Sequence, residues 1–150
     1  MIKFLRSFFH TLRERLSKGR PLRRRIGVVG KNENLSRYIF STRHFSRHLN
    51  RIKGEAYMPN RGEVSVFRTD RLTDSAIWEI GSDVATKSKR TLYARGDTKA
   101  HEVRKVGLDI LAEEPPLRHA NLVGWPEGDK PRQKLIALQI AAGATLVLKD

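Results

Sequence analysis

The sequence predicts an α+β fold: a single small domain with a mixed or antiparallel sheet and about three helices, preceded by a basic amphipathic N-terminal helix. The length of 150 residues suits one domain with a modest core. From residue 53 onward, short segments typical of strands alternate with segments that repeat apolar residues at helical spacing. Charge divides the chain, because residues 1–53 hold 15 of the 30 Lys and Arg but only two of the 16 acidic residues.

The first two elements of the domain form a predicted hairpin. Residues 53–58 and 63–68 are typical of strands, and Pro59, Asn60 and Gly62 supply turn chemistry between them. A helix is predicted next, within residues 73–90, because its apolar residues recur at near-helical spacing after a capping residue.

The cap of this helix is Thr73 or Asp74, and the strand 91–95 follows it. After that strand, Asp97 or Thr98 is predicted to cap a second, short helix.

Glycine and proline mark the remaining boundaries. Gly107 closes the short helix, and residues 108–111 return as a strand. The stretch "AEEPPLR" then forces a loop, and "NLVGWP" is a core strand that ends at its proline. Asp129 begins the last helix, Gly143 ends it, and residues 144–149 form a terminal strand.

The chain therefore divides into a basic amphipathic arm (1–25), a basic connecting segment (26–52) and the α+β domain (53–150). Five apolar residues of the arm recur at helical spacing: Ile2, Leu5, Phe9, Leu12 and Leu16. Such a helix lies in an anionic membrane surface, docks on a protein partner or covers the core of its own domain. An organelle-targeting segment and a wrongly assigned start codon are two further interpretations.

The connecting segment contains aromatic residues among cations. Gly27, Gly30 and Lys31 have the wrong spacing for a phosphate-binding loop. The aromatic residues either stack on bases or belong to the core, and the core interpretation is favoured, since a short segment must find something to pack against. His44 and His48 lack the glutamate of a zinc-protease motif.

Charge asymmetry this strong predicts a polyanionic partner, and we expect a small nucleic-acid-associated binding or accessory protein. A solubilising tail is the alternative explanation of the charge. The predicted nucleic-acid-binding residues are all arginines of the first third: Arg23, Arg24, Arg25, Arg37, Arg43, Arg47 and Arg51.

Other classes are excluded by composition. The chain has no cysteine, so a disulfide framework, a thiolate zinc site and a catalytic cysteine are all ruled out. No apolar run approaches the roughly 18 residues that a membrane-spanning helix needs. The sequence predicts no cofactor and no metal site, and it favours a cytoplasmic protein that is peripheral to a membrane if it binds one.

An enzyme acting on a phosphate ester or nucleotide is an alternative from a different class. His119 is its candidate acid or base, because the imidazole titrates near neutrality. Three arginines are candidates for holding the phosphate: Arg68, Arg95 and Arg118. A structural role, in which His119 caps a loop next to a core strand formed by Leu122, Val123 and Trp125, is favoured over this catalytic role, since no nucleophile or partner base is identifiable from spacing.

Three stretches carry a resemblance: "SVFRT" (65–69), "LYARGD" (92–97) and "RHANLVGWP" (118–126). Together they resemble a group of small, uncharacterised bacterial proteins with no assigned activity. The resemblance covers residues 35–150 and implies a bacterial source. It transfers no catalytic residue and no cofactor.

Overall fold

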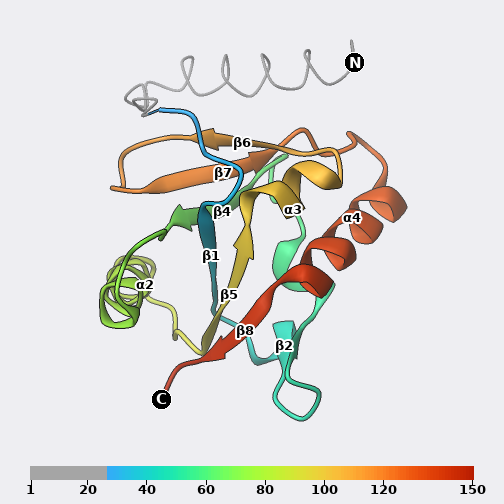
Figure 1. Ribbon diagram of the computed structural model, residues 1–150. Coiled ribbons are helices and arrows are strands. Elements are labelled where there is room, and N and C mark those ends of the chain that lie inside the picture. Colours follow the sequence, from blue (N-terminus) through green and yellow to red (C-terminus); the bar gives the residue numbers. More distant parts are fainter. Residues whose placement is uncertain (1–26) are drawn as a thin grey trace.

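The computed structural model describes residues 27–150, which form a six-stranded sheet with helices on both faces (Figure 1). Its strand order is β6-β7-β4-β1-β5-β8, and every neighbouring pair is antiparallel. The strands are β1 (Asn34–Ile39), β4 (Val64–Arg68), β5 (Ala94–Lys99), β6 (Asp109–Ala112), β7 (His119–Val123) and β8 (Thr145–Leu148). The predicted α+β class is confirmed, whereas the predicted arm helix lies outside the described residues.

Within the described residues, three α-helices cover the sheet: α2 (Asp74–Ser88), α3 (Ala100–Lys105) and α4 (Lys130–Gly143). Two of them begin at predicted caps. The Thr73 side chain accepts a hydrogen bond from the backbone N–H of Ala76, and Asp129 accepts one from the N–H of Arg132. Within residues 27–150, no helix is long and apolar enough to cross a membrane.

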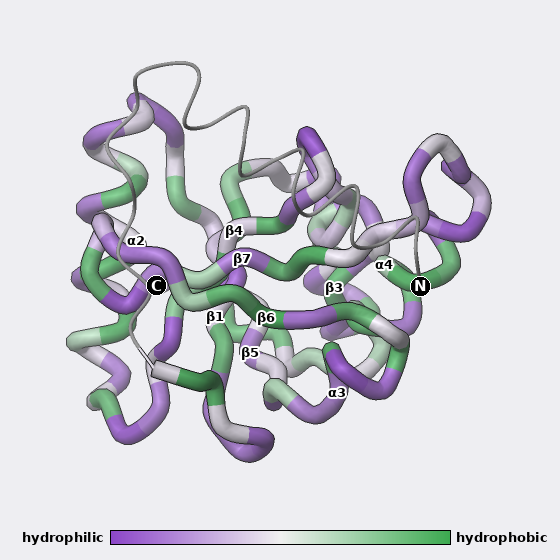
Figure 2. Tube along the Cα trace, turned by 90° about the horizontal axis from the view of Figure 1, so that it is seen from above, coloured by the Kyte–Doolittle hydropathy of each residue, from purple (hydrophilic) through white to green (hydrophobic). Residues whose placement is uncertain are grey.

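The core lies on both faces of the sheet. Leu35 and Ile39 of β1 pack with Ile140 of α4 in the larger cluster, and Val103 of α3 belongs to the same cluster. On the opposite face, α2 covers a smaller cluster formed by Tyr38, Phe67, Ile77 and Leu92. Figure 2 shows hydrophobic and hydrophilic residues alternating along the elements, as expected where each has one buried side.

The basic connecting segment contributes a central strand. β1 lies between β4 and β5, and it pairs with β5 from Asn34↔Lys99 to Ile39↔Ala94. Both of its faces are covered, because Leu35 faces α4 while Tyr38 faces α2. Residues 34–39 are therefore integral to the sheet that residues 53–150 complete.

The predicted strand 53–58 is wrong, and the hairpin with 63–68 does not form. Residues Gly54–Tyr57 make a 3-10 helix, η2, that lies under α4. Its Ala56 and Tyr57 are buried. Gly54 permits this approach, since an added Cβ would lie 3.3 Å from the backbone nitrogen of Leu138. Tertiary packing against α4 thus overrides the local strand preference.

The boundary between β5 and α3 also differs from the prediction. Asp97 and Thr98, expected to cap the helix, lie inside β5, where they pair with Ser36 and Leu35. The helix begins only at Ala100, after Lys99, and no side chain caps it. Pairing with β1 therefore extends the strand through Asp97 and Thr98, the two residues that the local pattern assigned to the start of a helix.

Candidate functional site

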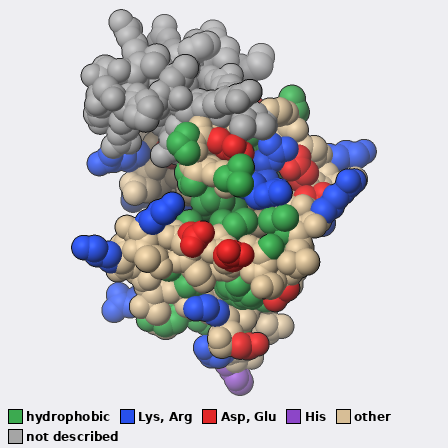
Figure 3. Space-filling model, turned by 90° about the vertical axis from the view of Figure 1, so that its left-hand side faces the viewer, with side chains coloured by type: hydrophobic (Ala, Val, Ile, Leu, Met, Phe, Trp, Pro, Cys, Tyr) green, Lys and Arg blue, Asp and Glu red, His purple; other side chains and the backbone are tan. Residues whose placement is uncertain are grey.

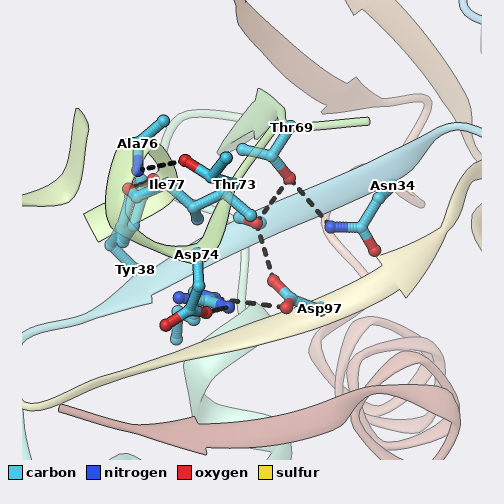
Figure 4. Close-up of polar contacts among 10 residues, drawn as sticks. Asn34, Tyr38, Thr69, Thr73, Asp74, Ala76, Ile77 and Asp97 are labelled. Carbon is cyan, nitrogen blue, oxygen red and sulfur yellow. Dashed lines mark hydrogen bonds and ion pairs between the residues drawn. The ribbon is translucent and has the colours of Figure 1, made fainter. Parts of the chain in front are cut away.

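A polar network lies on the face of the sheet that carries α2 (Figure 4). The buried Ser36 hydroxyl donates to Asp97 Oδ1 at 2.6 Å and lies 2.7 Å from Thr69 Oγ1. Asn34 Nδ2 donates to the same Thr69 oxygen at 2.8 Å. Because a hydroxyl has one proton, Thr69 must donate to Ser36, and the bonds run in one direction from Asn34 to Asp97.

The buried Arg95 extends this network toward α2. Its Nε donates to Asp97 at 3.1 Å, and its Nη2 donates to Asp74, the first residue of α2, at 2.6 Å. The guanidinium carbon also lies 4.5 Å from the ring centroid of Trp78. Burial disfavours the charge of Arg95, but the two carboxylates more than offset this and raise its pKa.

A second arginine candidate is held by a glutamate. Arg68 contacts both carboxylate oxygens of Glu33, at 2.8 and 2.9 Å, in a two-point geometry. This hydrogen bonding lowers the pKa of Glu33 despite its partial burial. Arg118, the third phosphate candidate, has a left-handed backbone with φ of 68°, and its N–H donates to Glu114 at 2.9 Å.

His119 is a buried residue of β7 with contacts at both ring nitrogens. Nδ1 lies 2.9 Å from the carbonyl oxygen of Glu113, and Nε2 lies 2.7 Å from the Ser65 hydroxyl. A carbonyl only accepts, so Nδ1 carries a proton and donates to Glu113, while Nε2 shares a hydrogen bond with the Ser65 hydroxyl. The ring also packs edge-on against Phe67. These contacts join β7 to β4 and to the β6–β7 loop.

His119→Ala is expected to lower the free energy of unfolding by about 2–3 kcal/mol, because the buried Glu113 carbonyl and the Ser65 hydroxyl lose their hydrogen bonds to the ring and a cavity forms. Urea denaturation measures this. The exposed His101 provides the matched control, and His101→Ala should change stability by less than about 0.5 kcal/mol. An unchanged unfolding free energy for His119→Ala would contradict the structural role.

The predicted nucleic-acid-binding arginines occupy different environments. Arg37 points into the protein, where it donates to the carbonyls of Ala56 and Ser65, both at 2.9 Å. Burial lowers its pKa. Arg23, Arg24 and Arg25 lie outside the described residues, and Arg43, Arg47 and Arg51 lie on a hairpin.

This hairpin, residues 41–53, contains η1 (Thr42–His44), β2 (Phe45–Ser46) and β3 (Arg51–Ile52), and we call it the basic hairpin. Phe45 and Ile52 pair and are buried, which anchors it to the body. It presents four exposed cations: Arg43, Arg47, Arg51 and Lys53. None of the four forms an ion pair with another of residues 27–150. Figure 1 shows the hairpin projecting from the body.

An apolar groove of about 600 Å³ lies between α2 and the β6–β7 loop. Its lining residues are Phe67, Leu72, Ala76, Glu79, Ile80, Asp83, Val84, Lys87, Ser88, Pro116, Leu117 and Arg118. Figure 3 shows hydrophobic side chains gathered among acidic and basic ones on this side of the molecule. We call this feature the α2 groove.

The three stretches that carry the resemblance meet on one side of the sheet. They supply Thr69 and Arg95 to the polar network, and His119 to the contact with Ser65. Sequence reasoning gave no site role to Asn34, Ser36, Thr69 or Asp74, which all belong to this network. Ser36 was detectable only by treating residues 34–39 as a strand, since strand alternation places it between Asn34 and Tyr38 on one face.

Comparisons with family models, with curated proteins and with solved structures gave no match. In the part of the chain that the structure describes, no three His, Asp or Glu side chains gather as metal ligands would. The candidate site therefore has to be judged from its own geometry and charge.

Proposed function

We propose that this protein is a small nucleic-acid-binding protein that contacts phosphates through its basic hairpin and the Arg-rich segment at residues 20–25. One observation carries the proposal: the basic hairpin presents four exposed cations and contains no acidic residue. Exposed cations on a projecting element gain most from a polyanion, because binding releases the counterions condensed on nucleic acid.

The aromatic residues of this region support phosphate contacts over base contacts. Tyr38 is 3% exposed and Phe45 is 6% exposed, so neither ring is available for stacking. Their burial favours the core interpretation. Binding is therefore driven by charge, and it has little sequence preference.

The geometry gives less support to a phosphate-processing enzyme. Arg68 is engaged by Glu33, and Arg95 is engaged by Asp74 and Asp97, so both guanidinium groups already hold carboxylates. His119 is buried between two strands of the sheet. An incoming phosphate would have to displace these partly buried carboxylates, which costs more than binding at the exposed hairpin.

The test is a salt titration of the full-length protein with a fluorescent duplex oligonucleotide. Each phosphate contact contributes about −0.9 to the log–log slope of affinity against salt on duplex and about −0.7 on single strands. R43A/R47A/R51A is expected to reduce the duplex slope by about two to three units. Solvated arginines add little to folding, so circular dichroism should show an unchanged fold.

The matched control removes three exposed lysines from the α3 and α4 side, in the variant K99A/K105A/K134A, which has the same loss of charge. Its slope should change by less than about one unit if the hairpin forms the site. An unchanged slope for the hairpin variant, or equal losses in both variants, would overturn the proposed site. Binding to vesicles containing phosphatidylserine is measured in parallel. Tighter binding to vesicles than to duplex at equal salt would favour a membrane partner instead.

A further inference from the structure

The α2 groove exposes apolar surface that no described element covers. Leu117 is 71% exposed on one wall, while Leu72, Ile80 and Val84 are half-buried along the opposite wall. Phe67 lies at the junction of the groove with the sheet. A continuous apolar groove of this size is typical of a surface that binds another segment or molecule.

One stripe of α2 forms the length of the groove. Ala76, Ile80 and Val84 recur every four residues. Ala76 and Val84 are eight residue positions apart, which corresponds to about 12 Å along a helix. An occupant that matches this stripe is a helix of similar apolar length.

The arm of this chain has that pattern. Leu5, Phe9, Leu12 and Leu16 recur at helical spacing, and Leu5 and Leu16 are eleven positions apart. In a helix the apolar stripe of the arm would be about 16 Å long, which is enough to cover the apolar stripe of α2.

The charged residues around the groove balance, because its lining holds two acids, Glu79 and Asp83, and two cations, Lys87 and Arg118. Residues 2–16 carry four cations and one acid. The attraction of these cations to the two acids is opposed by Lys87 and Arg118, so apolar contact is what favours docking of the arm.

The linker is long enough for docking within one chain. Residues 17–26 span at most about 33 Å when extended. Figures 1 and 2 both draw the start of the described chain, at Gly27, on the side of the molecule where α2 lies. A linker of ten residues also holds the arm near the groove at an effective concentration in the millimolar range.

We propose that residues 2–16 dock as a helix in the α2 groove of the same chain, with Leu5, Phe9, Leu12 and Leu16 against the stripe of α2. This inference is distinct from the nucleic-acid proposal, because the residues that form the docking contact, 2–16 and the α2 groove, belong neither to the basic hairpin nor to residues 20–25. It assigns a binding surface to the face of α2 that the sheet leaves open.

Disulfide trapping in the full-length protein tests the proposal cleanly, because the natural chain has no cysteine. Phe9 lies near the middle of the arm stripe, so F9C is paired with I80C or with V84C at the middle of the groove. At dilute protein and mild oxidation, at least one pair should form a covalently closed monomer, and the preferred pair reports the direction of the arm. F9C paired with A142C, an exposed position on α4, is the matched control and should crosslink roughly tenfold more slowly.

A trypsin assay on the cysteine-free chain gives a second measurement. Val84→Glu places a charge in the groove and should increase cleavage after Arg13 and Arg15 about tenfold, since docking protects these bonds. Thr86→Glu, on an exposed side of the same helix, should leave the rate unchanged. Equal crosslinking by the control pair, covalent dimers in place of closed monomers, or equal cleavage of both glutamate variants would each overturn docking within one chain.

Discussion

Gly96→Ala is expected to destabilise the protein by about 3 kcal/mol, because the new methyl group enters a filled part of the core. An added Cβ would lie 2.4 Å from Cδ1 of Ile52 and 2.7 Å from the hydroxyl of Tyr57. Tyr57 is fully buried under α4 and cannot move aside without disturbing η2. Thermal unfolding should show a decrease in Tm of about 10 °C.

Gly30→Ala is the matched control, since its Cβ would meet only Glu33, at 3.6 Å. We expect Gly30→Ala to change the free energy of unfolding by less than about 0.5 kcal/mol. Tyr57→Phe offers a further check, because the Tyr57 hydroxyl has no hydrogen-bond partner among the described residues. Tyr57→Phe alone should leave the free energy of unfolding almost unchanged. Combined with Gly96→Ala, it should recover part of the stability that Gly96→Ala loses. Full stability of Gly96→Ala would show that this part of the core is not closely packed.

Arg95→Met is expected to cost about 2–3 kcal/mol of unfolding free energy, because it leaves Asp97 partly buried without its cation. The Asp97 side chain is 18% exposed, whereas that of Asp74 is 69% exposed, so most of the penalty arises at Asp97. Methionine retains apolar contact with Trp78, which limits the change to charge and hydrogen bonding. Urea denaturation is the measurement.

A thermodynamic cycle separates the charge effect from packing. Adding Asp97→Asn to Arg95→Met removes the uncompensated carboxylate and should recover more than about 1 kcal/mol. Arg71→Met is the control, since the Arg71 side chain is 94% exposed and reaches Asp70 only at 4.0 Å. If Arg71→Met lowered the free energy of unfolding as much as Arg95→Met does, or if the double variant regained no stability, the role assigned to Arg95 would be contradicted.

Local chemistry made some elements predictable. The caps at Thr73 and Asp129 identified the starts of α2 and α4, and turn residues bounded β4. The strand β1 was not predicted from the sequence, and the reason is physical. Its buried apolar residues Leu35, Tyr38 and Ile39 have the i, i+3, i+4 spacing of a helix, because a strand buried on both faces loses simple alternation.

The candidate site was less predictable, since its contacts join residues far apart in the sequence. Ser36 meets Thr69 across 33 positions, and Ser65 meets His119 across 54 positions. Only the strand order brings such residues together, and no local pattern encodes that order. The exposed arginines of the basic hairpin were foreseeable from charge alone, whereas the inward direction of Arg37 depends on η2.

The strand order also has a consequence for how the chain acquires its structure. β1 is the first strand of the sheet along the chain, yet it lies at the centre and its partners β4 and β5 come about 30 and 60 residues later. Both hydrogen-bonding edges of β1 therefore stay unpaired until distant segments are present. Large loops must close before strand pairing can offset the chain entropy that loop closure costs. α4, which covers the larger core, follows later still. A chain emerging from the ribosome at the usual 5–20 residues per second would hold an unpaired central strand for several seconds, and during that time the strand is open to pairing with other chains.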